Sequence, residues 1–99
     1  MAGKIIWAPS AQTSFDDLIE FLEAKWEKKV IEKLFTELFK TLKVIAENPE
    51  IYPIASSKKS IRKCIIRKKT VLIYKINPDK NILLVVFADT RQNPNKYKI

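Results

Sequence analysis

The stretch 60–88, SIRKCIIRKKTVLIYKINPDKNILLVVFA, contains three consecutive apolar runs and decides the fold class. The runs SIRKCIIRK, TVLIYKI and ILLVVFA are rich in β-branched and aromatic residues, which favour strands. The short connections KK and NPDKN are compatible with hairpin turns. The stretch therefore predicts three strands that follow one another along the chain as a meander.

Two amphipathic helices are predicted ahead of these strands, because apolar residues recur there at helical spacing. The first helix starts at Ser10, the expected N-cap, and its apolar face runs from 15 to 26. The apolar face of the second runs from 31 to 45, and the motif ENPEIYP at 47–53 ends it, because a residue before proline disfavours helix. The short connection between them predicts an antiparallel helical hairpin.

Residues 4–8, KIIWA, form a short apolar run that Pro9 stops, which is typical of an edge or central strand. The predicted order is therefore strand, helix, helix, strand, strand, strand. We predict an α+β fold with an antiparallel-dominated four-stranded sheet and an N-terminal helical hairpin packed on one face. A length of 99 residues fits one domain over 1–99.

The last predicted strand, ILLVVFA at 82–88, is apolar on both faces, as a strand buried on both sides would be. The two helices can cover only one face of the sheet. The other face could be covered in four ways: by the C-terminal tail, by a second copy of the chain, by another protein, or by a strong curl of the sheet itself. We favour a partner protein, because an uncovered apolar face is typical of an interaction surface.

The residue types limit the chemistry. The chain has no histidine and one cysteine, Cys64, so a Ser-His-Asp or Cys-His nucleophile is excluded and a zinc site is not expected. We expect Cys64 to be a small core residue, and we predict no metal and no cofactor. The sequence shows neither a signal peptide nor an apolar run long enough for a membrane span, so we expect a cytoplasmic protein.

The charge of the chain is unevenly distributed. The formal net charge is +8, and residues 51–99 carry twelve basic residues against two acids, whereas residues 5–50 carry nine acids against six lysines. Seven basic residues fall between Lys58 and Lys69 with no acid among them. This asymmetry predicts a polyanion or an acidic protein as partner, and solubility alone is the alternative interpretation.

The C-terminal stretch DTRQNPNKYKI, 89–99, follows the last strand directly and brings Arg91 and Tyr97 toward the basic hairpin. An arginine fork suits phosphate, and a tyrosine can stack on a base or act as a general base if cations lower its pKa. Arg91 pairing with Asp89, and Tyr97 packing on the sheet, are the structural alternatives. The candidate residues for binding nucleic acid or a partner are Lys58, Lys59, Lys63, Lys68, Lys69 and Lys96.

Taken in order, four stretches resemble the RelE/ParE family of small toxins from prokaryotic type II toxin–antitoxin modules. They are IIWAPSAQTSFDDLIEFLEAKW (5–26), ENPEIYP (47–53), IRKCIIRKKTVLIYKI (61–76) and VVFADTRQNP (85–94), which together span almost the whole chain. The resemblance implies a sheet with a helical hairpin on one side. It also implies a cognate antitoxin, usually acidic and partly disordered until bound, of which a segment wraps the toxin.

The family has two branches that differ in mechanism. The RelE-like branch cleaves mRNA on the ribosome, and this resemblance implies a metal-independent endoribonuclease with the catalytic residues Arg62, Arg67, Arg91 and Tyr97. The ParE-like branch inhibits DNA gyrase by protein contact and needs no catalytic residues. Val71 and Cys64 stand where the RNA-cleaving branch has basic residues, and Arg91 is common to both branches. Both mechanisms, and a degenerate member that only binds its partner, remain open at this point.

Overall fold

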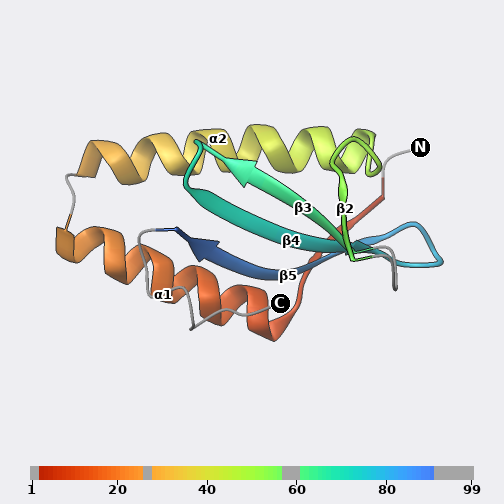
Figure 1. The fold of residues 1–99 in the computed structure, drawn as a ribbon, viewed down its shortest axis with the longest axis horizontal. Coiled ribbons are helices and arrows are strands. Elements are labelled where there is room, and N and C mark those ends of the chain that lie inside the picture. Colours follow the sequence, from red (N-terminus) through yellow and green to blue (C-terminus); the bar gives the residue numbers. More distant parts are fainter. Residues whose placement is uncertain (1–2, 26–27, 57–60, 91–99) are drawn as a thin grey trace.

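The computed structural model describes residues 3–25, 28–56 and 61–90. Its elements are β1 (Ile5–Trp7), α1 (Pro9–Lys25), α2 (Lys28–Glu47), β2 (Ile54–Ser56), β3 (Ile61–Ile66), β4 (Thr70–Ile76) and β5 (Ile82–Asp89). The strands form one mixed sheet in the order β1-β5-β4-β3-β2 (Figure 1). The pair β1–β5 is parallel, and the other three neighbouring pairs are antiparallel.

The prediction of a four-stranded sheet is wrong, because the structure contains a fifth strand, β2. This strand has only three residues and follows Pro53, so it is too short to show an alternating pattern in the sequence. It pairs antiparallel with the start of β3, with Ile54 opposite Arg62. The predicted α+β class, the two helices and the three-stranded meander are all present.

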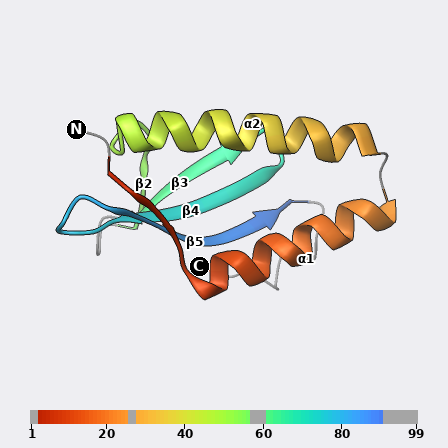
Figure 2. The ribbon, with the colours of Figure 1, turned by 180° about the vertical axis from the view of Figure 1, so that it is seen from behind.

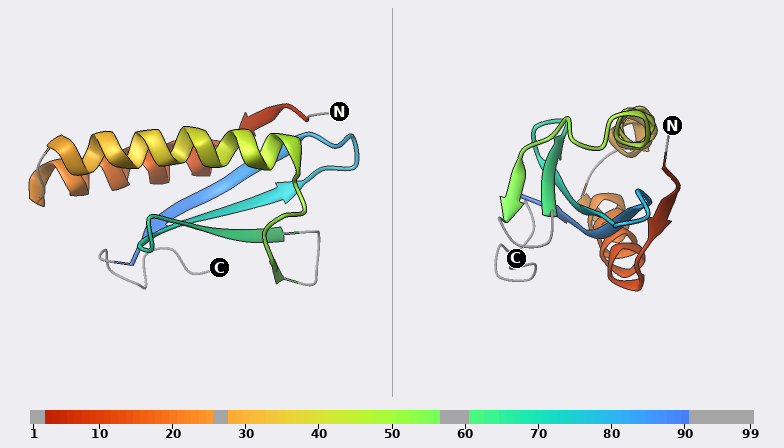
Figure 3. Two further views of the ribbon diagram at one scale, coloured as in Figure 1. Left: turned by 90° about the horizontal axis from the view of Figure 1, so that it is seen from above. Right: turned by 90° about the vertical axis from the view of Figure 1, so that its right-hand side faces the viewer.

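Both helices lie on the same side of the sheet, as Figures 2 and 3 show. Their buried residues pack against the helix-facing side chains of β3, β4 and β5 to form the core. This core contains Phe15, Leu18, Leu22, Leu34, Leu38, Leu42, Ile45, Cys64, Ile66, Leu72, Tyr74, Ile82, Leu84 and Phe87. Each large apolar side chain buried in this way contributes about 1.5–3 kcal/mol to folding. The sequence-based expectation of a buried Cys64 is confirmed.

Ser10 is not the N-cap, because α1 already begins at Pro9, where the missing N–H of proline leaves no helical hydrogen bond unmade. The Ser10 hydroxyl instead donates to the carbonyl oxygen of Val85. Val85 is an extra residue in β5, since the β4–β5 register shifts there. Beside it, the Phe87 N–H donates to Ser14 Oγ at 2.9 Å. Two serines of α1 therefore satisfy backbone groups around the bulge.

The other side of the sheet faces away from the helices, and we call it the outer face. It carries Ile61, Lys63, Ile65, Val71, Ile73, Lys75, Leu83, Val86 and Ala88, which alternate with the core residues of β3, β4 and β5. Ile73, in the central strand β4, is buried, whereas Lys63 is exposed and Ile65 is 56% exposed. The helices cover one face only, as the sequence predicts.

The chain's single glycine, Gly3, closes a corner between β1, the end of α2 and the β4–β5 turn. Its N–H donates to the carbonyl oxygen of Ala46 at 3.3 Å. A Cβ atom at this position would overlap with the backbone carbonyl oxygen of Lys80. A residue without a side chain is therefore required for this close approach of two backbones.

Candidate functional site

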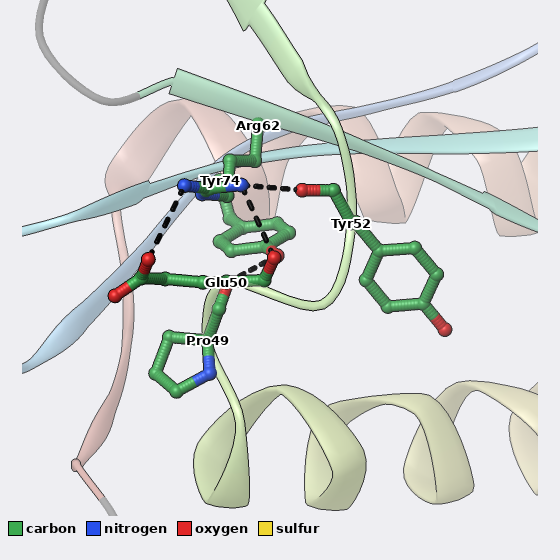
Figure 4. A network of polar contacts seen from close by, with 5 residues as sticks. All are labelled: Pro49, Glu50, Tyr52, Arg62 and Tyr74. Carbon is green, nitrogen blue, oxygen red and sulfur yellow. Dashed lines mark hydrogen bonds and ion pairs between the residues drawn. The ribbon is translucent and has the colours of Figure 1, made fainter.

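Arg62 lies in β3 and turns its guanidinium toward the segment 49–53 that follows α2 (Figure 4). Its Nη1 donates to the carbonyl oxygens of Tyr52 at 2.6 Å and Glu50 at 3.2 Å. Its Nη2 lies 3.9 Å from a carboxylate oxygen of Glu50, a side chain that is 79% exposed, so this ion pair adds little. The side chain of Arg62 is only 14% exposed. The guanidinium therefore fixes the segment 49–53 to the sheet.

Tyr74 supports the same segment from β4, where it pairs with Arg62 across the two strands. Its hydroxyl donates to the carbonyl oxygen of Pro49 at 2.7 Å (Figure 4). Burial raises the pKa of Tyr74 to about 12, although the charge of Arg62 acts in the opposite direction. Burial also raises the pKa values of Tyr52 and Cys64. These groups are therefore protonated at neutral pH, and the Tyr74 hydroxyl serves as a hydrogen-bond donor.

The β3–β4 turn displays three exposed basic side chains, those of Arg67, Lys68 and Lys69. Arg67 and Lys68 have positive φ angles of 51° and 67°, a conformation that costs a non-glycine residue about 1–2 kcal/mol. The Thr90 N–H donates to the Lys69 carbonyl oxygen at 2.8 Å, which ties the turn to the end of β5. Arg67 also borders a groove of about 530 Å³, whose other lining residues are Lys29, Glu32, Lys33, Thr36 and Glu37 of α2.

The outer face offers little for catalysis. Its described residues are apolar side chains and the two lysines Lys63 and Lys75, without a carboxylate, an imidazole or a tyrosine hydroxyl. Among the residues that the structure describes, no group of histidine, cysteine, aspartate and glutamate side chains could hold a metal ion. The same part of the chain contains no helix that is long and apolar enough to span a membrane. The outer face is thus an apolar and basic surface.

A helical hairpin on one face of a meander, with ENPEIYP anchored to β3 and β4, agrees with the family that the sequence resembles. A family model described as "ParE toxin of type II toxin-antitoxin system, parDE" matches residues 5–94. The chain belongs to this family. No curated protein matches it. As a ParE-family toxin, the chain is the toxin component of a type II toxin–antitoxin module, and a cognate antitoxin is its partner.

The ParE-family fold does not bring the described candidates for catalysis together. Arg62 and Arg67 are five residues apart along β3 and its turn, which separates their backbones by about 17 Å. The Arg62 side chain is largely buried and contacts carbonyl groups, whereas Arg67 is exposed beside α2. The other two candidates, Arg91 and Tyr97, lie outside the described residues, so the four-residue set stays a prediction.

The candidate binding residues fall in two places on this ParE-family toxin. Lys63 lies on the outer face, and Lys68 and Lys69 lie in the β3–β4 turn. Lys58, Lys59 and Lys96 lie outside the described residues. Sequence reasoning missed the role of Arg62 and Tyr74 as anchors of the segment 49–53. The sequence shows only part of this arrangement. ENPEIYP predicts a turn after the helix, but it does not indicate which side chains bind the carbonyl groups of that turn.

Proposed function

We propose that this ParE-family toxin inhibits DNA gyrase through protein contact and catalyses no reaction of its own. The observation that supports this mechanism is the chemistry of the outer face, whose described residues include no carboxylate, imidazole or tyrosine hydroxyl to move a proton. Arg62, the basic side chain of β3 that the RNA-cleaving mechanism would use, has its guanidinium on backbone carbonyl groups instead. An inhibitor that acts by contact needs neither a group that moves a proton nor a free catalytic arginine.

The antitoxin, in this proposal, lays an acidic and amphipathic segment on the outer face. Ile65 is 56% exposed there, and the exposed Lys63 lies on the same face two residues away. Apolar side chains of the antitoxin would cover Ile65 and its neighbours, while its carboxylates would pair with Lys63 and Lys75. The predominance of basic residues in 51–99 supports an acidic partner for this half of the chain.

Induction of the toxin alone in a bacterial host tests the mechanism. Pulse labelling should show a prompt fall in DNA synthesis with intact mRNA, and the purified toxin should inhibit supercoiling by purified gyrase. A fall in translation with cut mRNA would instead support the RelE-like alternative, with Arg62, Arg67, Arg91 and Tyr97 as its predicted catalytic residues.

Substitution of Tyr97 separates the two mechanisms further. Tyr97→Phe removes a hydroxyl that a nuclease would use for proton transfer, but keeps an aromatic ring for packing. We expect toxicity and gyrase inhibition to be unchanged in this variant. A loss of toxicity by orders of magnitude, together with a loss of mRNA cleavage, would refute the contact mechanism.

The antitoxin surface is tested by reversing one charge. Lys63→Glu on the outer face should weaken antitoxin binding at least about tenfold, because like charges then face each other. Lys29→Glu on α2 makes the same change of charge away from this face and serves as the control. Equal affinities of the two variants for the antitoxin would rule out the outer face as its site.

A further inference from the structure

Phe39 of α2 is the most exposed large apolar side chain among the described residues, with 64% of its surface accessible. An exposed position on a helix of this kind normally carries a charged or polar residue, because a phenylalanine there contributes little to the core. The core-facing side of α2 is complete without Phe39, since its buried residues are Leu34, Leu38, Leu42 and Ile45. The burial of α2 against the core therefore does not require an aromatic ring at position 39.

A row of aromatic contacts leads from the ring of Phe39 into the core. It stacks on Phe35 with ring centroids 6.4 Å apart and an angle of 22° between the planes. Phe35 meets Phe15 of α1 edge to face at 5.7 Å, and Phe15 in turn packs against Phe87 of β5 at 5.1 Å. Phe87 and Phe15 are buried, so the row has a rigid base. A ring that already stacks on its neighbour loses less conformational entropy on binding than one without such a contact.

Charges beside Phe39 indicate the chemistry of its partner. Lys43 lies one helical turn from Phe39 on the same side of α2 and is exposed, whereas Lys40 follows Phe39 directly in the chain and lies 4.0 Å from a carboxylate oxygen of Glu37. An exposed aromatic side chain with an exposed lysine one turn away suits an apolar pocket that has carboxylates at its rim. Phe39 is on α2, which lies together with α1 on the opposite side of the sheet from the outer face (Figure 3).

We propose that Phe39 is the anchor with which this toxin binds its target protein, inserting its ring into an apolar pocket rimmed by carboxylates. The inference rests on the proposed function, in which the target is DNA gyrase. It assigns target and antitoxin to opposite sides of a sheet in a molecule that measures 22 Å along its shortest axis. A bound antitoxin would still obstruct a large target, because so thin a molecule gives little separation between the two sides.

The test compares Phe39→Ala with the wild-type toxin and with Val44→Ala in a gyrase supercoiling assay. Val44 is also on α2 and 38% exposed, so its truncation controls for a general loss of apolar surface. Phe39→Ala should lower inhibitory potency roughly 10- to 100-fold, as expected for a central aromatic anchor, and Phe39→Tyr should restore it. Val44→Ala should change potency less than about threefold. Antitoxin affinity, measured by calorimetry, should be unchanged in every variant.

Each outcome decides the inference. If the wild type inhibits gyrase and Phe39→Ala inhibits it equally well, Phe39 is not the anchor, while the proposed function stands. If Phe39→Ala loses affinity for the antitoxin, or turns a dimer seen by light scattering into a monomer, the antitoxin or a second copy occupies this site and the inference is wrong. If the wild type does not inhibit gyrase, the proposed function fails and the inference fails with it.

Discussion

Arg62→Ala should destabilise the toxin strongly, because within the described part of the chain its guanidinium binds the carbonyl groups of the segment 49–53. The variant loses two hydrogen bonds from a charged donor to carbonyl oxygens, each worth about 1.5–3 kcal/mol. The exposed ion pair with Glu50 adds at most about 1 kcal/mol. Nε of Arg62 is buried without a hydrogen-bond partner among the described residues, which costs the wild-type toxin about 1–3 kcal/mol. Because the substitution removes this group, it offsets part of the loss.

The net loss in the free energy of unfolding is therefore about 2–4 kcal/mol, which lowers the Tm of a domain of this size by roughly 10–25 °C. Urea unfolding followed by circular dichroism measures the first quantity, and calorimetry the second. Arg62→Met keeps much of the aliphatic stem, so its free energy of unfolding should fall less than that of Arg62→Ala. Glu50→Ala should cost less than about 1 kcal/mol, because only the exposed ion pair is lost.

A local measurement separates this mechanism from a general loss of packing. The Lys63 N–H donates to the Pro53 carbonyl oxygen at 3.1 Å, so its hydrogen exchange reports whether the segment stays docked. Arg62→Ala should speed exchange at Lys63 more than in the centre of β4. If Arg62→Ala costs no more than Arg67→Ala, a change at an exposed turn, the role assigned to Arg62 is refuted.

Three further variants test other contacts. Because the pKa of Tyr74 rises from its usual 10.0 to about 12, its contribution to stability is complete below pH 10 and is lost, by up to roughly 2–3 kcal/mol, as pH rises to about 12. Tyr74→Phe should remove this part of the pH dependence, and an unchanged difference between the two proteins over pH 9–12 would contradict it. Gly3→Ala should cost about 1–3 kcal/mol by urea unfolding, because its Cβ would meet the Lys80 carbonyl, and a neutral result would contradict the close approach. Ser14→Ala leaves the buried Phe87 N–H without its acceptor and should cost about 1–3 kcal/mol, whereas Thr13→Ala on the exposed side of α1 should not.

The sequence by itself determined the helices and the three long strands, because their patterns are local. Apolar residues at helical spacing specify the buried faces of α1 and α2, and the proline after Asn48 ends the second helix. The runs in 60–88 specify the meander, since each is long enough to show β-branched and aromatic enrichment. The composition also determined which chemistries are absent, because a chain without histidine cannot form a Ser-His-Asp or Cys-His site.

Only the tertiary structure decided how segments distant in sequence meet. The strand β2 is too short to carry a pattern and exists because β3 offers it a ladder of hydrogen bonds. Ser10 is not the N-cap, because α1 begins one residue earlier, at Pro9, and the Ser10 hydroxyl donates instead to a carbonyl group in the bulge of β5. Arg62 has the residue type expected at a phosphate site, but its guanidinium donates hydrogen bonds to carbonyl groups of the segment 49–53. Hydrogen-bond partners of this kind depend on three-dimensional proximity, which no local pattern in the chain encodes.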